Sequence, residues 1–324
     1  MAVRCAIIFN GNNDNFKSGE MITGIIEIVL NEKRSLRHLM VTIEGNGEVK
    51  WPSLTFSDNG VHSQFTNSEQ YFKESIHIFG CSDQLYEEEI VYLDSGIHVY
   101  PFSYELPLNL PSSFHGSFGS INYVVTAVVD TLDCNITVVR PFQISNESLL
   151  HDVSKFPFVA EVSSEFCFCF FWNAKPLFMA ASISHSGYET GDDISVTIEL
   201  VNRSRVSIMN ISVELVQVII YKSKAPKEHR KVDEKILVKS NGPYVGREKS
   251  RIFTSKLAIP NFIPPTQRHA CQMIEIHYRI NVRLAAQFHQ IIRLHPSLTL
   301  PITIGIRPNS KETNVGTTAA AIAP

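Results

Sequence analysis

Long apolar runs, clustered cysteines and export signals are all scarce in this 324-residue chain. No apolar stretch approaches the ~18 residues that a membrane-spanning helix needs. Residues 1–10 lack the long apolar segment and small-residue cleavage site of a secretory signal. The 6 cysteines are scattered, as is typical of reduced thiols in the cytosol rather than of a disulfide scaffold. The sequence therefore predicts a cytoplasmic protein with peripheral membrane association at most.

Signatures of catalysis are missing as well. The chain contains no Gly-x-Ser-x-Gly elbow, phosphate-binding loop, dinucleotide fingerprint or His-Glu-x-x-His motif. His269 and Cys271 are the nearest approach to metal-ligand spacing, and two ligands do not complete a tetrahedral zinc site. We therefore expect no enzymatic activity, no cofactor and no metal.

Two further cysteines alternate with aromatic residues in the segment 166–172. On a strand, Cys167 and Cys169 would share one face and the intervening phenylalanines the other. Packing of both thiols as small apolar groups is the favoured interpretation. A thiol–metal site and a lipidated cysteine stay as alternatives.

Charge is distributed unevenly along the chain. Residues 1–160 carry 9 Lys and Arg against 19 Asp and Glu, whereas residues 161–324 carry 20 against 13. This basic excess is modest and has no RNA-binding signature, so nucleic acid is not an expected partner. The densest basic run, residues 221–231, predicts either a solvated hairpin loop or a contact for acidic lipid headgroups or acidic protein tails. Its candidate contact residues are Lys222, Lys224, Lys227, Arg230 and Lys231.

The apolar residues recur almost everywhere with the period of two that is typical of half-buried strands. Clear examples are residues 22–30, 39–44, 123–130, 194–200, 211–220 and 274–284. Glycine-containing and proline-rich breaks separate these segments and predict turns. Many short strands without intervening helices predict an all-β protein of antiparallel, immunoglobulin-like sandwiches.

The chain also repeats itself. Residues 16–29 recur as residues 188–201 at a constant offset of 172, and Leu39, Val41 and Ile43 fall on Ile211, Val213 and Leu215 at the same offset. Residues 102–106 resemble 253–257, and residues 121–125 resemble 276–280 after a proline-rich link in each copy. A glycine turn before one strand and a proline-rich corner before a tyrosine-bearing strand would explain both copies. We therefore predict two tandem sandwiches, 1–147 and 166–306, with a linker at 148–165 and a disordered tail at 307–324.

With this repeat, the chain resembles the arrestin-domain-containing proteins of the α-arrestin family. The resemblance rests on segments whose order and spacing together are fairly specific, and it covers roughly residues 3–306. They are residues 16–20, 49–51, 100–107, 110–116, 119, 121–123, 167–172, 187–191, 201–204, 259–266, 271, 278 and 301–305.

The resemblance implies a non-enzymatic cytoplasmic scaffold that binds the cytoplasmic tails of membrane receptors or transporters. Such proteins act in endocytosis and sorting at the plasma membrane or endosomes, and recruit ubiquitin ligases through Pro-Pro-x-Tyr motifs. In this sequence Pro264-Pro265 is followed by Thr266 and Gln267, so cargo binding or pairing with another arrestin-like chain is better supported than direct ligase recruitment.

Two alternative functions remain at this stage. A retromer-like coat subunit shares the arrestin fold but works as a stable member of an assembly. An extracellular adhesion protein of tandem immunoglobulin-like sandwiches would need a signal peptide and paired cysteines.

Overall fold

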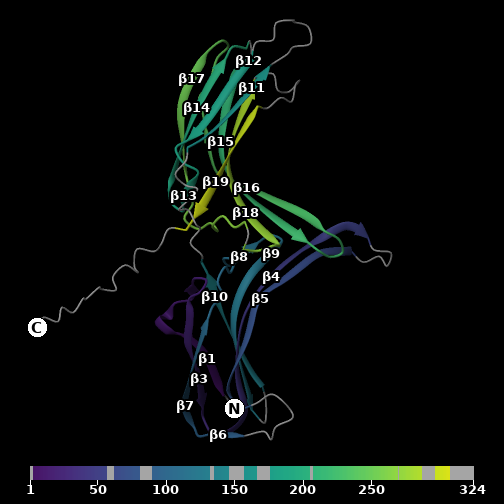
Figure 1. The fold of residues 1–324 in the computed structure, drawn as a ribbon, viewed down its shortest axis with the longest axis vertical. Helices are drawn as coiled ribbons and strands as arrows, with labels where there is room; N and C mark the ends of the chain where they lie inside the picture. Colours follow the sequence, from purple (N-terminus) through teal and green to yellow (C-terminus); the bar gives the residue numbers. More distant parts are fainter. Residues whose placement is uncertain are drawn as a thin grey trace, which may run out of the picture.

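The computed structural model describes residues 3–56, 62–80, 90–131, 135–145, 157–165, 176–204, 207–268, 270–286 and 296–306. Within these ranges the chain forms strands and one short 3-10 helix, Asn10–Asn12. Figure 1 shows two strand-rich bodies stacked along the long axis, one from each half of the chain. The candidate cysteines at 167 and 169, the segment 307–324 and His269 lie outside the described residues.

The first sandwich pairs two sheets. One sheet contains, in spatial order, β1 (Arg4–Phe9), β3 (Met21–Leu30) and β7 (Gly96–Glu105). The other contains β2 (Asn15–Phe16), β10 (Asn135–Ile144), β9 (Gly119–Thr131), β4 (Arg34–Phe56) and β5 (His62–Phe79), with β6 (Val91–Leu93) paired to β4 and β8 (Phe114–Gly116) paired to β9. Alternate residues of β3 and β9 are buried, so the apolar face of each sheet lines a shared core.

The second sandwich is built in the same way. Its first sheet contains β11 (Phe158–Glu165), β12 (Pro176–Ile183), β14 (Asp193–Asn202) and β17 (Ser250–Ala258). The facing sheet contains β13 (Gly187–Glu189), β19 (Ser297–Gly305), β18 (Ile274–Ala286), β15 (Ile208–Ser223) and β16 (His229–Asn241). The predicted all-β architecture of two sandwiches is confirmed.

Two details differ from the expectations. Strand β11 lies inside the segment 148–165 that we expected to be a linker, and it pairs with β12 along its whole length, so these eight residues belong to the second sandwich. The sheets are also not purely antiparallel, because β2 pairs with β10 and β13 pairs with β19 in parallel. A period-two pattern predicts a strand but not the direction of its neighbour.

The duplication extends to individual hydrogen bonds. The Lys17 N–H donates to Glu20 Oε2 at 2.7 Å, and at the same offset of 172 the Glu189 N–H donates to Asp192 Oδ2 at 2.8 Å. Each turn contains one glycine with positive φ, +78° at Gly19 and +86° at Gly191. Other residues adopt this conformation only with strain, which explains why both copies keep glycine here.

The proline-rich corners form the second shared feature. The Tyr123 hydroxyl donates to the Pro111 carbonyl at 2.6 Å, and the Tyr278 hydroxyl donates to the Pro264 carbonyl at 2.5 Å. Both tyrosine rings are fully buried. A buried phenol needs a partner for its O–H. The predicted corner before each tyrosine-bearing strand is therefore a structural element of both sandwiches.

One of the proposed internal matches is out of register. The Leu106 N–H donates to Glu20 O and the Ile259 N–H donates to Asp192 O, so Leu106 corresponds to Ile259 rather than to Leu257. The match of residues 102–106 with 253–257 is therefore shifted by two positions. A shift of two keeps every side chain on the same face of a strand, so the sequence pattern could not detect it.

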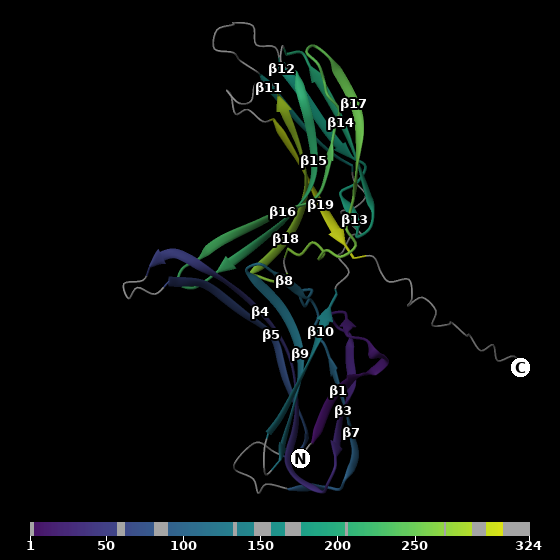
Figure 2. The same ribbon diagram turned by 180° about the vertical axis from the view of Figure 1, so that it is seen from behind.

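Two hairpins connect the sandwiches. The β4–β5 and β15–β16 hairpins project to the same side of the molecule and lie next to each other when seen from front and back (Figure 1, Figure 2). An antiparallel bridge between Thr66 and Ala225 links them. The basic segment 221–231 therefore lies at the contact between the two bodies.

Candidate functional site

The candidate basic segment forms the tip of the β15–β16 hairpin, where Lys222 pairs with Arg230 and Ser223 with His229. The tip is bound to the first sandwich through its backbone. The Thr66 N–H donates to the Ala225 carbonyl at 2.8 Å, and the Thr66 carbonyl accepts the N–H groups of Lys224 and Ala225 at 3.1 and 3.0 Å. We call this contact the joint. It is formed by Trp51, residues 65–71 and Phe118 of the first sandwich and by residues 221–231 and 271–273 of the second.

Aromatic rings cover the outer end of the joint. The imidazole of His229 stacks on the ring of Phe65 with centroids 4.6 Å apart, and Phe65 stacks on Trp51 at 5.7 Å. Trp51 and Phe65 are buried although they lie on a projecting hairpin. Large buried rings dominate the energetics of protein contacts, so this stack anchors one hairpin to the other.

The five candidate basic residues divide into two groups. Lys222 forms an ion pair with Glu275, and the Lys231 ammonium lies 3.8 Å from the centroid of the Phe118 ring in the first sandwich. These two side chains therefore have partners within the protein. The side chains of Lys224, Lys227 and Arg230 are exposed and form no ion pair with another described residue.

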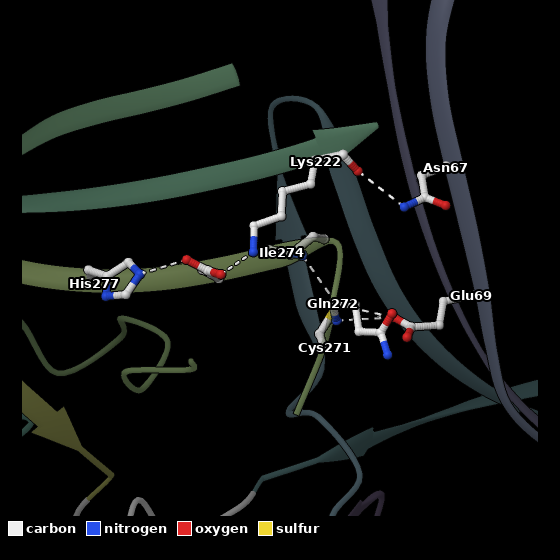
Figure 3. A network of polar contacts seen from close by, with 8 residues as sticks. Asn67, Glu69, Lys222, Cys271, Gln272, Ile274 and His277 are labelled. Atoms are coloured by element: carbon white, nitrogen blue, oxygen red, sulfur yellow. Dashed lines mark hydrogen bonds and ion pairs between the residues drawn. The ribbon is translucent and has the colours of Figure 1, made fainter. Parts of the chain in front are cut away.

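The inner part of the joint is polar (Figure 3). Alternate residues of β5 face the second sandwich, as the period of a strand requires. The Asn67 amide donates to the Lys222 carbonyl at 3.2 Å, and Glu69 Oε2 accepts the Gln272 N–H at 3.3 Å. The Tyr71 hydroxyl donates to Cys271 Sγ at 3.2 Å. These contacts give the two sandwiches a specific orientation in addition to apolar contact.

The one cysteine of the joint is buried and poorly suited to nucleophilic chemistry. Burial raises the pKa of the Cys271 thiol above its ordinary value, which keeps the sulfur protonated and weakly nucleophilic. Among the described residues, no group of three or more His, Cys, Asp and Glu side chains could hold a metal ion. His269, which with Cys271 came nearest to metal-ligand spacing in the sequence, lies outside the described residues.

Glu275, at the start of β18, forms an ion pair with Lys222 and so links the basic segment to this strand. Burial alone would raise the pKa of this carboxyl, but hydrogen bonds from Lys222 and His277 lower it below its ordinary value. Glu275 therefore stays ionised and holds the Lys222 side chain away from the exposed tip.

Sequence reasoning found only one half of the joint. It identified the basic run but not Trp51, Phe65 or the alternating polar residues of β5, because these look like an ordinary half-buried strand. The available signal was Trp51 itself, since a large aromatic residue near a hairpin tip needs something to cover it.

No helix in the described part of the chain is long and apolar enough to cross a bilayer. The profile of the family described as "Arrestin (or S-antigen), N-terminal domain" matches residues 5–150, and "Arrestin (or S-antigen), C-terminal domain" matches residues 173–309. Together these matches cover both sandwiches.

The chain belongs to the arrestin-domain-containing family. It is 26% identical over 323 residues to arrestin domain-containing protein 17 of Caenorhabditis elegans, covering 94% of this chain and 71% of that protein. It is 24% identical over 306 residues to arrestin domain-containing protein 4 of Homo sapiens, covering 90% and 68%. Over 230 residues it is 27% identical to arrestin domain-containing protein 15 of Caenorhabditis elegans, covering 61% and 60%. Proteins of the arrestin family are generally non-enzymatic adaptors that interact with other proteins.

Proposed function

We propose that this arrestin-domain protein is a cytoplasmic adaptor that binds the tails of membrane receptors or transporters. It is recruited to the plasma membrane or endosomes and takes part in the endocytosis and sorting of these cargo proteins. The observation that carries the proposal is the division of the basic segment. Two basic side chains have partners within the protein, and Lys224, Lys227 and Arg230 are left exposed at a tip that the joint holds in place.

A rigid tip with three exposed cations suits an acidic or phosphorylated tail. Lys and Arg side chains bind carboxylate and phosphate groups through charge-assisted hydrogen bonds. Backbone hydrogen bonds between Thr66 and residues 224 and 225 hold the tip in place. Binding therefore has a smaller entropic cost, because the tip is already ordered. Since the three side chains are exposed, the interaction would weaken as the salt concentration rises.

Charge reversal of the free residues tests this proposal. The variant Lys224→Glu, Lys227→Glu, Arg230→Glu is expected to lose binding to phosphorylated tail peptides at least about tenfold, mainly by slower association. The matched control is Lys235→Glu, Arg251→Glu, Lys256→Glu, which changes the net charge equally at exposed positions of β16 and β17 away from the tip. An equal loss of peptide affinity in both variants would show a general effect of net charge and would contradict a role of the tip in binding.

Ligase recruitment is a separate part of the proposal. Pro264 accepts the Tyr278 hydroxyl, and the Thr266 N–H donates to the Ile304 carbonyl, so the Pro264-Pro265 segment is engaged in the second corner. We infer that a ubiquitin ligase reaches the cargo through another arrestin-like chain rather than through this segment. Proximity labelling in cells tests this inference. Ligase labelling that persists after the partner arrestin-like chain is removed would contradict it.

A further inference from the structure

A charged pocket lies on the second sandwich, on the sheet that includes the β15–β16 hairpin but away from the hairpin tip. It has a volume of about 580 Å³. Its lining comes from β15, β16, β18 and the start of β19, and its polar residues are Asn210, Ser212, Glu214, Lys239, Arg283 and Ser297. Hydroxyl, amide, ammonium and guanidinium groups therefore surround one cavity.

A buried carboxylate organises this pocket. The Glu214 side chain is only 3% exposed, and its Oε1 accepts the Ser212 hydroxyl at 2.7 Å and lies 3.1 Å from the Lys239 ammonium. Its Oε2 lies 3.7 Å from Nη1 of Arg283. Lys239 and Arg283 are 51% and 49% exposed, so both cations also remain accessible from outside.

The first sandwich shows that the fold does not require these charges. Glu214 pairs with Lys239 in β16 and with Asn281 in β18; the corresponding Thr42 pairs with Ser75 in β5 and with Thr126 in β9. Thr42 and Ser75 share a neutral hydrogen bond of 3.1 Å. By the same register, Val128 of β9 stands where Arg283 stands in β18.

Burying a carboxylate has a desolvation cost that a neutral pair avoids. Because the same backbone arrangement is stable with Thr42 and Ser75, the charged set in the second sandwich needs another explanation. Ligand binding supplies one. A carboxylate beneath two half-exposed cations fixes their positions and leaves their outer N–H groups available to a ligand.

We propose that this pocket binds a carboxylate group from an acidic segment of a partner protein. The two cations and Glu214 together carry one net positive charge, which a single carboxylate neutralises. A dianionic phosphate would leave a net negative charge beside a buried carboxylate, which is unfavourable. The proposal favours a peptide because β16 is the last strand of its sheet, so an extended segment has a strand edge beside the pocket.

This site is separate from the hairpin tip, and its test does not depend on a role in trafficking. The probe is a fluorescent hexapeptide of six glutamates with blocked ends, and its twin contains six glutamines. Binding is measured by fluorescence anisotropy at constant ionic strength on the full chain carrying Lys224→Glu, Lys227→Glu and Arg230→Glu, which removes the cations of the hairpin tip. The glutamate peptide is expected to bind and the glutamine peptide is not.

Single substitutions then separate a ligand site from a structural ion pair. Lys239→Ser leaves the pocket without net charge and is expected to weaken binding about tenfold, as loss of one charged hydrogen bond implies. Glu214→Thr removes the carboxylate that repels an anionic ligand. This gain is expected to outweigh the loss of the ion pairs that position Lys239 and Arg283, so that binding strengthens severalfold. A purely structural cluster would not move the two affinities in opposite directions.

The variant Glu214→Thr, Lys239→Ser, Arg283→Val copies the first sandwich and is expected to fold and to lose binding. Circular dichroism and the thermal midpoint report folding. Lys235→Ser, a charge loss elsewhere on β16, should leave the affinity unchanged. Equal binding by the triple variant overturns the proposal. So does displacement of the peptide by inorganic phosphate at lower concentration than by acetate, or preference for anionic lipid vesicles over the peptide.

Discussion

The first and second sandwiches share turns, corners and hydrogen bonds but differ in the side chains at many corresponding positions. Gly45 of β4 lies opposite Tyr123, whereas the second copy has Gln217 opposite Tyr278. In the first copy the aromatic rings of Phe72 and Tyr123 fill the space above Gly45. In the second, the Gln217 amide donates to the Tyr278 hydroxyl at 2.9 Å.

The difference shows which positions the architecture constrains. Main-chain turns and buried phenols are retained because an unpaired buried polar group is costly. Many of the other positions, buried or exposed, have diverged, and some of these form the joint and the charged pocket. The predictions below substitute residues whose counterparts in the other sandwich differ, as for Trp51, Gly45 and Glu214, or are the same, as for the corner tyrosines.

The largest effect is expected at Trp51, which has Ser223 at the corresponding position of the second copy. Trp51→Ala removes a buried ring from the stack with Phe65, and should lower the free energy of unfolding by about 3–5 kcal/mol. Urea denaturation measures this loss. His229→Ala is the control, because His229 is exposed and should cost far less. Equal losses would mean that the hairpin of the second sandwich, not the first, organises the stack.

Gly45→Ala should have the next largest effect. An added Cβ would lie 2.5 Å from Cε1 of Tyr123 and 2.8 Å from Cε1 of Phe72, so both rings must shift. Such overpacking costs roughly 2–3 kcal/mol. Gln217→Ala tests the corresponding position, where the backbone already carries a side chain, and should be milder. A neutral Gly45→Ala, measured by the thermal midpoint, would contradict the close packing of the first copy.

The two corner tyrosines allow a paired test. Tyr123→Phe and Tyr278→Phe each leave a proline carbonyl without its donor, at a cost of about 1–2 kcal/mol. Tyr278→Phe should cost more because it also leaves the buried Gln217 amide without its acceptor. Denaturation of both variants and of Tyr278→Phe combined with Gln217→Leu measures the difference. If the combined variant is no more stable than Tyr278→Phe, the Gln217 amide does not explain the larger cost.

The smallest effect concerns Glu214 and pH. Burial alone would raise the pKa of this carboxyl, but hydrogen bonds from Ser212 and Lys239 and the charge of Arg283 bring it below the ordinary value. A lowered folded-state pKa stabilises the protein above the unfolded-state pKa of about 4.3, and this contribution is lost as the pH falls through the folded-state pKa.

Glu214→Thr should therefore change stability by less than about 1 kcal/mol at neutral pH, because the buried charge is replaced by the neutral group of the first copy. The free energy of unfolding of the wild type minus that of the variant should become more negative as the pH is lowered to about 3. Urea midpoints across this range give the measurement. A difference that does not depend on pH would show that Glu214 does not titrate differently in the folded state.

Much of the scaffold could be predicted because its signals are local. Each copy of the repeat, residues 16–29 and 188–201, contains within a short stretch the turn glycine, the acidic residue that accepts a backbone N–H, and the alternating strand. The corner tyrosines follow their prolines closely in the chain. The register of β17 and the strand character of residues 158–165 were wrong or missed, because they depend on neighbours far away in sequence.

The site was only partly predictable for the same reason. The basic run was visible, but the sequence does not separate Lys222 and Lys231, which have partners, from Lys224, Lys227 and Arg230. That division requires Glu275 and Phe118, which reach the hairpin only after the sandwiches have folded and docked.

The sequence by itself determined two β-sandwiches, because strand periodicity, glycine turns and tyrosine corners act over short stretches of chain. Only the tertiary structure decided which surfaces are free. Strand register places Ser212, Lys239 and Arg283 around one buried carboxylate, and docking of two hairpins buries Trp51 beside His229. Both outcomes depend on contacts between residues far apart in sequence, which no local pattern encodes.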